Sequence, residues 1–246
     1  MKIIISPAKK MNVNTDDFPV DKLPVFIDDT RILCETIQKL SYAEAKALWK
    51  CNDKLAKLNY ERFAGMDLER ALTPALLSYE GLQYQHMMPV VFTSSAMDYV
   101  REHLRILSGF YGVLSPFDGV TPYRLEMQAA LSVGGSGNLY EFWGDRLYRA
   151  VLDEDRTILN LASKEYSKAV EKYLQPEDRL ITIVFGELAD GRVKQKGTLA
   201  KMARGEMVRY LAEGGITDLE RLKDFAGMGY QFAEEYSTGT EWTFLR

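Results

Sequence analysis

The chain has 246 residues, of which 46% are hydrophobic and 27% are charged, and its formal net charge is -4. This length accommodates one large domain or two small ones, and the apolar content is sufficient for a sizeable core. The acidic balance excludes a broadly basic nucleic-acid-binding protein, so any basic surface must be local.

The cysteine count and the apolar runs indicate the compartment. Only Cys34 and Cys51 occur, which argues against a disulfide framework and fits a reducing environment. The N-terminal run MKIIISPAKK is too short an apolar stretch for a signal peptide. No stretch approaches the roughly 20 apolar residues of a membrane span. The sequence therefore predicts a cytoplasmic protein without a membrane partner.

The first predicted strand is the β-branched run 2–6, which Pro7 ends. Lys9 follows in a loop at the carboxyl end of this strand, where α/β folds commonly place ligand contacts. Residues 12–24 are polar and contain prolines, so we expect a loop there. Residues 31–40 have the apolar spacing of a helix.

Residues 41–63 have the pattern of a helical hairpin. Ser41 and Glu44 form a capping box for a helix that runs to about Trp49, and a second helix follows residues 51–53. The charged side of this second helix has two interpretations: a solvated face, or a site where a turn amide and basic side chains hold one phosphate strand. The residues concerned are Lys54, Lys57, Asn59, Glu61 and Arg62.

The middle of the chain predicts strands at 75–79 and 110–114, separated by a helix that Ser95 caps. An apolar stripe with i, i+4, i+7 spacing indicates this helix, and we expect it to end at 108–109, because glycine ends a helix without a Cβ clash. The residues of the stripe are Val100, Leu104 and Leu107.

Two proline turns follow this region, at 115–116 and 121–122. Because the chain reverses at each turn, we expect Arg105 and Arg124 to be brought back towards one another, with Glu126 beside them. We interpret this convergence as the functional surface.

The glycine-rich segment 134–138 predicts a flexible turn. It lacks the Lys-Ser/Thr and the dinucleotide spacing of phosphate-binding loops. The aromatic residues that follow within 139–148 have helical spacing, so we interpret them as core rather than as a stacking platform.

Two further β-branched runs predict strands at 157–161 and 180–185. The first leads through 162–163 into a helix, and the second leads into a turn over 186–191 in which Asp-Gly is a hairpin signal. The helix begins with Lys164, Glu165, Tyr166 and Lys168.

The segment 192–209 is the strongest local positive patch in this acidic chain. Its first part alternates as a strand, and Thr198 is expected to cap a helix behind it. The apolar residues of the helix must pack against the core, which leaves its basic side facing outward. The patch is therefore either a solvated face or a functional surface. Its basic residues are Arg192, Lys194, Lys196, Lys201, Arg204 and Arg209.

The C-terminal region contains a second candidate for a DNA motif. The Gly-Met-Gly turn at 227–229 has the spacing of a helix-hairpin-helix element. The alternating residues 230–232 and 241–244 around Ser237-Thr238-Gly239 favour a terminal β-hairpin instead.

Several kinds of chemistry fit the sequence poorly. His86 and His103 are the only histidines and the cysteines lack CxxC spacing, so no metal site is expected. No G-x-S-x-G nucleophile elbow is present. What remains is a set of basic residues at strand ends and helix starts, which suits a polyanion or a phosphorylated ligand. These residues are Lys9, Arg105, Arg124, Lys164, Lys201 and Arg204.

The chain resembles the YaaA-type peroxide stress proteins in motifs that span nearly its whole length. The matching pieces are Ile5-Ser6-Pro7-Ala8-Lys9, Asp53-Lys54-Leu55-Ala56, Asn59, Arg62-Phe63, His103-Leu104-Arg105, Ser108-Gly109, Tyr111-Gly112-Val113-Leu114, Pro116, Asp118, Pro122-Tyr123-Arg124-Leu125-Glu126-Met127, Phe142-Trp143-Gly144-Asp145, Asn160-Leu161-Ala162-Ser163, Glu165-Tyr166, Lys168, Ala200-Lys201, Ala203-Arg204-Gly205 and Gly229-Tyr230 with Phe232. The chain departs from the pattern at Asn52, at Ser115 and at Gly81-Leu82.

The resemblance implies one mixed α/β domain over residues 1–246, with a central sheet, surrounding helices and a positively charged cleft. It implies a cytosolic protein that protects against hydrogen peroxide by limiting free intracellular iron and oxidative damage. It also implies DNA binding through a helix-hairpin-helix element, which would be the 41–63 hairpin.

Two hypotheses follow. The first is a stress protein that binds DNA through a basic cleft, with little base-specific readout. The alternative is an enzyme that acts on a small phosphorylated or nucleobase-like ligand in the same cleft, with Glu126 or Glu165 as acid or base. No cofactor is expected, and an iron-binding role is disfavoured because iron ligands are scarce. The anion-binding candidates are Lys9, Lys54, Lys57, Arg62, Arg105, Arg124, Lys164, Lys168, Lys194, Lys201, Arg204 and Arg209.

Overall fold

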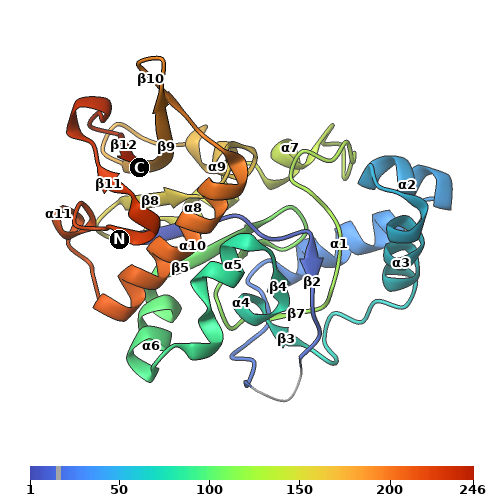
Figure 1. The fold of residues 1–246 in the computed structure, drawn as a ribbon. Coiled ribbons are helices and arrows are strands. Elements are labelled where there is room, and N and C mark those ends of the chain that lie inside the picture. The colour runs from blue at the N-terminus through green and yellow to red at the C-terminus, as the bar shows by residue number, and fades with distance from the viewer. Residues whose placement is uncertain (15–17) are drawn as a thin grey trace.

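A central sheet organises the protein, and the fold is the mixed α/β arrangement that the sequence predicts (Figure 1). The computed structural model describes residues 1–14 and 18–246. The predicted loop over 12–24 includes residues 15–17, which lie outside the described residues. The sheet has eight strands in the order β11-β12-β9-β8-β1-β5-β6, with β10 paired to β9. Their bounds are β1 Lys2–Ile5, β5 Leu104–Ser108, β6 Gly112–Leu114, β8 Thr157–Leu161, β9 Arg179–Ala189, β10 Arg192–Lys194, β11 Gln231–Phe232 and β12 Glu241–Leu245.

Strand β1 lies in the middle of the sheet because its residues are apolar on both sides. Ile3, Ile4 and Ile5 are fully buried. The strand pairs in parallel with β5 on one side and with β8 on the other. A parallel strand covered on both faces has a continuous rather than an alternating apolar run, which is the pattern of residues 3–5.

The strand order contains a topological switch point. From β1 the chain forms β5 and β6 on one side, and then crosses to form β8, β9 and β12 on the other. The pairs β1–β5, β1–β8, β8–β9 and β9–β12 are all parallel. In open α/β sheets ligands bind outside the carboxyl ends of the strands where the order reverses. Here that place lies between the ends of β1 and β8.

Helices and short segments pack around this sheet, and two small two-stranded sheets, β2–β4 and β3–β7, accompany it. The helices are α1 Ile27–Gln38, α2 Tyr42–Trp49, α3 Asp53–Ala64, α4 Ala75–Ser78, α5 Leu82–Met87, α6 Ser94–His103, α7 Leu139–Trp143, α8 Arg146–Val151, α9 Lys164–Glu171, α10 Gly197–Gly214 and α11 Leu219–Leu222. The remaining elements are β2 Lys10–Met11, β3 Thr73–Pro74, β4 Tyr79–Glu80, β7 Gly119–Val120, η1 Pro89–Val91, η2 Gly227–Gly229 and η3 Glu234–Tyr236.

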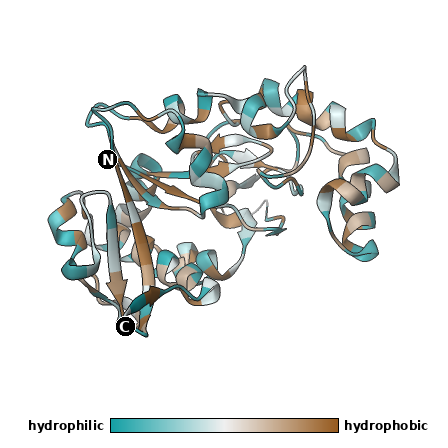
Figure 2. Ribbon diagram, turned by 90° about the horizontal axis from the view of Figure 1, so that it is seen from above, coloured by the Kyte–Doolittle hydropathy of each residue, from teal (hydrophilic) through white to brown (hydrophobic). Residues whose placement is uncertain are grey.

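The helical hairpin α2–α3 projects at one end of the molecule, away from the β11–β12 edge (Figure 1). The Ser41–Glu44 capping box is present, as predicted. Trp49 stacks on Phe63 with 5.7 Å between ring centroids, and Phe63 meets Phe110 of the body at 5.4 Å. Viewed from above, the hairpin again stands apart from the rest of the molecule (Figure 2). Aromatic contacts therefore attach the hairpin to the core.

No helix in the described part of the chain is both long and apolar enough to cross a bilayer.

The prediction of a helix that extends to Ser108 is wrong. Helix α6 ends at His103, and β5 occupies Leu104–Ser108. Its cap is Thr93, whose hydroxyl accepts a hydrogen bond from the amide of Ala96, and not Ser95. The apolar spacing that suggested a helix belongs partly to a strand buried on both faces, because pairing with β1 decides the conformation.

Three other boundaries differ from expectation. The predicted strand at 75–79 is a one-turn helix, α4, between two-residue strands. Helix α10 begins at Gly197 after Lys196, without a side-chain cap from Thr198. Strand β9 extends through most of the predicted 186–191 turn, because the β9–β10 hairpin closes only at Asp190-Gly191. Both of these residues have positive φ, as a two-residue hairpin turn requires.

The predicted strands at 157–161 and 180–185, the helix after Ser163 and the terminal β-hairpin are confirmed. The predicted strand at 110–114 is confirmed only for Gly112–Leu114. Trp143 and Tyr148 are buried, as expected for core aromatics.

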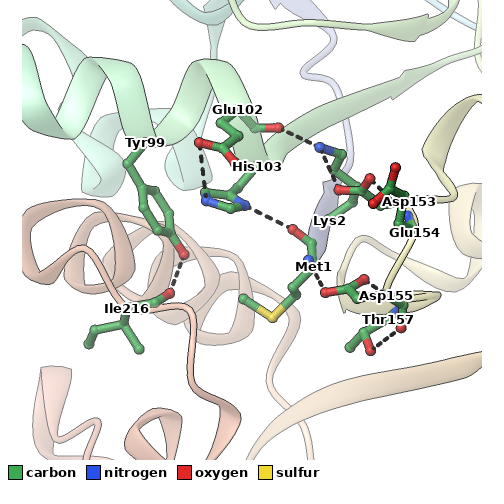
Figure 3. Close-up of polar contacts among 10 residues, drawn as sticks. All are labelled: Met1, Lys2, Tyr99, Glu102, His103, Asp153, Glu154, Asp155, Thr157 and Ile216. Atoms are coloured by element: carbon green, nitrogen blue, oxygen red, sulfur yellow. Dashed lines mark hydrogen bonds and ion pairs between the residues drawn. The ribbon is translucent and has the colours of Figure 1, made fainter.

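Polar contacts fix the amino end of β1 (Figure 3). The Lys2 ammonium lies 2.9 Å from the Asp153 carboxylate and donates to the carbonyl of Glu102. Nδ1 of His103 lies 2.9 Å from the carbonyl oxygen of Met1, and the terminal ammonium pairs with Asp155. These contacts join β1 to α6 on one side and to the approach to β8 on the other. They hold the strand whose other end reaches the switch point.

Asp118 gives a pH-dependent contribution to stability. It is 1% exposed, and burial raises the pKa of its carboxyl group to about 6. The folded protein therefore holds this proton more tightly than the unfolded chain. Its stabilising effect is complete below pH about 3.8 and is lost as the pH rises through about 6. Across that window the loss is about 3 kcal/mol.

We expect Asp118→Asn to remove this dependence. Denaturant unfolding between pH 4 and about 7 measures the free energy of unfolding of the wild type and of the variant. The difference between these two free energies should change most below pH about 6. The exposed Asp98→Asn serves as control. A difference that stays constant with pH contradicts the assignment.

Candidate functional site

A cavity of about 370 Å³ lies at the switch point. We call it the central pocket. Its walls come from five separated parts of the chain: the end of β1, the start of α5, the loop before Met127, the start of α9 and the first half of α10. The lining residues are Ser6, Pro7, Ala8, Lys9, Lys10, Glu80, Gly81, Leu82, Gln83, Tyr84, Tyr123, Arg124, Leu125, Glu126, Ser163, Glu165, Tyr166, Lys201 and Arg204.

Hydrogen bonds join the two strand ends at the base of the pocket. The amide of Ser163 donates to the hydroxyl of Ser6 at 2.8 Å, and the Ser6 hydroxyl donates to that of Ser163 at 3.2 Å. The hydroxyl of Tyr84 donates to the carbonyl of Ser6 at 2.9 Å. Ser163 precedes α9 and its side chain makes no cap bond. The first amides of a helix have no intrahelical acceptor, so this helix start can receive an anion.

A glutamate with two basic neighbours forms one wall. Glu126 accepts from the guanidinium of Arg124 at 3.0 Å and lies 2.9 Å from the ammonium of Lys9. The Arg124 side chain is 10% exposed, whereas Lys9 is exposed. These two contacts hold the loop after β1 against the 123–126 loop. Sequence reasoning placed all three residues among the candidates, and the structure does bring them into one pocket.

Helix α10 supplies two further basic residues of the lining. It packs against α5 at Gly205, where an added Cβ would lie only 2.1 Å from the carbonyl oxygen of Gln83. This close approach places Lys201 and Arg204 on the pocket. Arg204 is mostly buried, and burial lowers the pKa of its guanidinium. Within residues 1–14 and 18–246, neither basic residue has a hydrogen bond or an ion pair.

Several donors on the pocket wall lack acceptors. Nε of Arg204, Nε of Arg124 and Nε2 of Gln83 are buried, and none meets an acceptor among the residues that the structure describes. Gln83 is only 6% exposed. Buried donors without acceptors are costly and uncommon, so the protein maintains this wall of the pocket at an energetic cost.

Glu165 is the carboxylate at the start of α9. Burial raises the pKa of Glu165, and the neighbouring Glu126 raises it further, whereas the amide of Gln128 and the ammonium of Lys9 lower it. One carboxylate oxygen accepts the Gln128 amide at 3.3 Å. A carboxyl group that is half-buried among charged neighbours can accept a hydrogen bond from a ligand or exchange a proton with it.

The structure separates the other candidates from the central pocket. The guanidinium of Arg105 donates to the carbonyls of Arg101 and Leu104 and is absent from the lining, so it does not converge with Arg124. Several helix and strand candidates have partners of their own. Lys164 pairs with Glu171, Lys194 with Asp190 and Arg209 with Glu213, and Lys168 lies over the ring of Tyr140.

The hairpin candidates lie elsewhere. Lys54 and Lys57 are exposed on α3, and Arg62 is half-buried, with its pKa lowered by burial. A small hollow of about 30 Å³ lies between the α2–α3 turn and the pocket loop. Trp49 and Lys50 line it from one side, and Arg124 and Glu126 from the other. The hairpin turn therefore lies next to the central pocket.

Sequence reasoning missed a group of lining residues. Gln83 and Tyr84 follow a segment that was predicted as a plain strand, and Ser6 and Ser163 are small residues without an individual signal. Two signals were available for the serines: Ser6 ends the predicted strand 2–6 and Ser163 lies just after the predicted strand 157–161, and both belong to motifs of the family resemblance. Among the described residues, no group of three or more His, Cys, Asp or Glu side chains is arranged to hold a metal ion.

The topology and the pocket define a class: a mixed α/β protein with a ligand-sized crevice at the switch point of a mainly parallel sheet. The family model for "Peroxide stress protein YaaA" matches residues 1–236. The chain belongs to this peroxide stress protein family, which supports a role in peroxide stress.

Relatives extend the match along the whole chain. A UPF0246 protein of Agathobacter rectalis is 55% identical over 246 residues, covering 100% of this chain and 99% of the relative. UPF0246 proteins of Lactiplantibacillus plantarum and Pediococcus pentosaceus are 54% and 50% identical, cover 100% of this chain, and are themselves covered to 99% and 98%.

Proposed function

We propose that this protein acts in peroxide stress by binding a small anionic molecule in the central pocket. The observation that carries the proposal is Arg204, a mostly buried guanidinium on the pocket wall that meets no acceptor within the described ranges. Lys201 on the same helix and the start of α9 face the same cavity. Fixed donors and charges of this kind suit a phosphate or a carboxylate.

The size of the pocket favours a small occupant. Its volume of about 370 Å³ lies within the usual range of sites for single small molecules. A DNA duplex would instead require an open groove that follows the phosphate backbone. For an enzyme that acts on the bound molecule, Glu126 or Glu165 would serve as the general acid or base.

The cellular role follows from the family resemblance. We propose that ligand binding serves the limitation of free intracellular iron and of oxidative damage in the cytoplasm. Low-temperature electron paramagnetic resonance of chelated ferric iron in peroxide-treated cells measures this pool. Cells whose protein cannot bind the anion should retain more free iron than cells with the wild type, and equal pools would count against the link.

DNA binding is a second candidate, favoured by the α2–α3 hairpin. Asn52 caps α3 by accepting the amide of Leu55, and the exposed Lys54 and Lys57 lie in the first two turns behind it. Neither lysine has an ion pair in the part of the chain that the structure describes. Exposed cations beside a helix start can hold phosphates of a nucleic-acid backbone without reading bases.

One set of variants tests both candidates. Lys201→Ala should weaken the binding of inorganic phosphate about tenfold in isothermal titration calorimetry, because one charge-assisted contact is removed. Lys54→Ala/Lys57→Ala should leave phosphate binding unchanged, but weaken duplex DNA binding at low salt and reduce the salt slope by about 2.

The two candidates fail separately. Absence of phosphate binding at millimolar concentration, or an unchanged affinity in Lys201→Ala, overturns the pocket proposal. DNA binding that is absent at low salt, or that ignores both salt and the double substitution, overturns the hairpin proposal.

A further inference from the structure

The charges in the central pocket are largely paired in two groups. Lys9 and Arg124 share Glu126, at 2.9 and 3.0 Å. Lys10 pairs with Glu80 at 2.7 Å. These five side chains all have partners among themselves, and together they carry a net charge of +1. What an occupant must complement is the remainder of the lining.

The remaining charges have opposite signs and lie on different helices. Lys201 and Arg204 are basic and belong to α10, whereas Glu165 is acidic and belongs to the start of α9. Across the described stretches of the chain, none of the three forms an ion pair. A pocket with unpaired positive charge on one element and an unpaired carboxylate on another suits a molecule with two different ends.

The lining also contains three tyrosines. Tyr84, Tyr123 and Tyr166 are each less than 9% exposed. The hydroxyl of Tyr84 is engaged by Ser6, and that of Tyr123 lies 2.8 Å from the hydroxyl of Tyr79 and 2.6 Å from that of Ser108. Because these hydroxyl groups are bonded within the protein, the small exposed part of each of these two tyrosines adds apolar surface to the lining. Apolar surface beside a few charged groups suits the base and sugar of a nucleotide.

We infer that the occupant of the central pocket is a nucleoside monophosphate. Its phosphate would lie at Lys201 and Arg204, its base would lie against the tyrosines, and an N–H group of the base would donate to Glu165. This inference rests on the proposed anion site and names the class of molecule that the site takes. A carboxylate that accepts from base N–H groups is a recurrent mode of nucleobase recognition.

Calorimetry with three probes tests the inference: inorganic phosphate, adenosine monophosphate and cytidine monophosphate. At least one nucleotide should bind the wild type tenfold or more tightly than phosphate. Glu165→Gln should lose most of this advantage and leave phosphate binding unchanged or slightly stronger, because a negative charge is removed. Glutamine keeps an oxygen that can accept the Gln128 amide, and a melting curve verifies folding.

Glu171→Gln is the matched control on the same helix, since Glu171 pairs with Lys164 outside the pocket lining. It should keep the nucleotide advantage. If phosphate binds and neither nucleotide binds more tightly, or if Glu165→Gln weakens phosphate and nucleotide equally, this inference is overturned while the proposed anion site stands. If none of the three probes binds, the proposed site fails as well.

Discussion

Replacing Arg204 by methionine should weaken phosphate binding at least tenfold and yet leave the unliganded protein as stable as the wild type, or more so. Arg204 is mostly buried and has no acceptor among the described residues, so its charge is desolvated without compensation. Methionine keeps the unbranched stem and removes the charge. A binding residue whose removal does not destabilise the free protein is characteristic of a functional site.

Thermal melting without ligand and calorimetry with phosphate give the two readouts. Arg209→Met is the control on the same helix, because Arg209 pairs with Glu213 and does not line the central pocket. It should leave phosphate affinity unchanged. A large loss of stability in Arg204→Met would show that the guanidinium has a structural role, and unchanged affinity would remove it from the site.

Gly205→Ala should be among the most destabilising single-methyl changes in this protein. The added Cβ would lie 2.1 Å from the carbonyl oxygen of Gln83 and 3.0 Å from the amide nitrogen of Met87. Both atoms belong to the backbone of α5, so a side-chain movement cannot relieve the clash. We expect a loss of about 3 kcal/mol, at the upper end of overpacking costs, and a melting temperature lower by roughly 10 °C.

The same change should reduce ligand binding, because a displaced α10 moves Lys201 and Arg204 away from the pocket. Gly197→Ala provides the control in the same helix, where an added Cβ meets nothing within 4 Å. It should have little effect on melting or on phosphate affinity. A normal melting curve for Gly205→Ala would mean that the α5–α10 approach is looser than the structure shows.

The sequence predicted the parts of the fold in which local pattern and tertiary environment agree. The run 157–161 is β-branched and lies in the buried sheet, and the capping box at Ser41 needs only its own helix. The segment 104–108 shows the opposite case. Its spacing fits a helix, but pairing with β1 makes it a strand, and a single sequence contains no signal for that partner.

The site was predictable to the same degree. Lys9 was placed at a strand end, and Lys201 and Arg204 were placed on one helix, which is where the structure has them. Their common pocket depends on the approach of α10 to α5 at Gly205, a contact between segments about 120 residues apart. Arg105 was misplaced because its strand was read as a helix, which changes the direction of every side chain in the segment.

The wide separation of the pocket walls has a consequence for synthesis. The lining begins at Ser6 and ends at Arg204, so all but the last part of the chain must be made before the pocket exists. Parallel strands distant in sequence also pair slowly, because the chain loses conformational entropy in closing the loop between them before their contacts stabilise the pairing. A ribosome-bound chain that lacks α10 therefore has no complete site. An anion that binds the finished pocket can stabilise the protein only once α10 is in place, and it cannot template the early steps of folding.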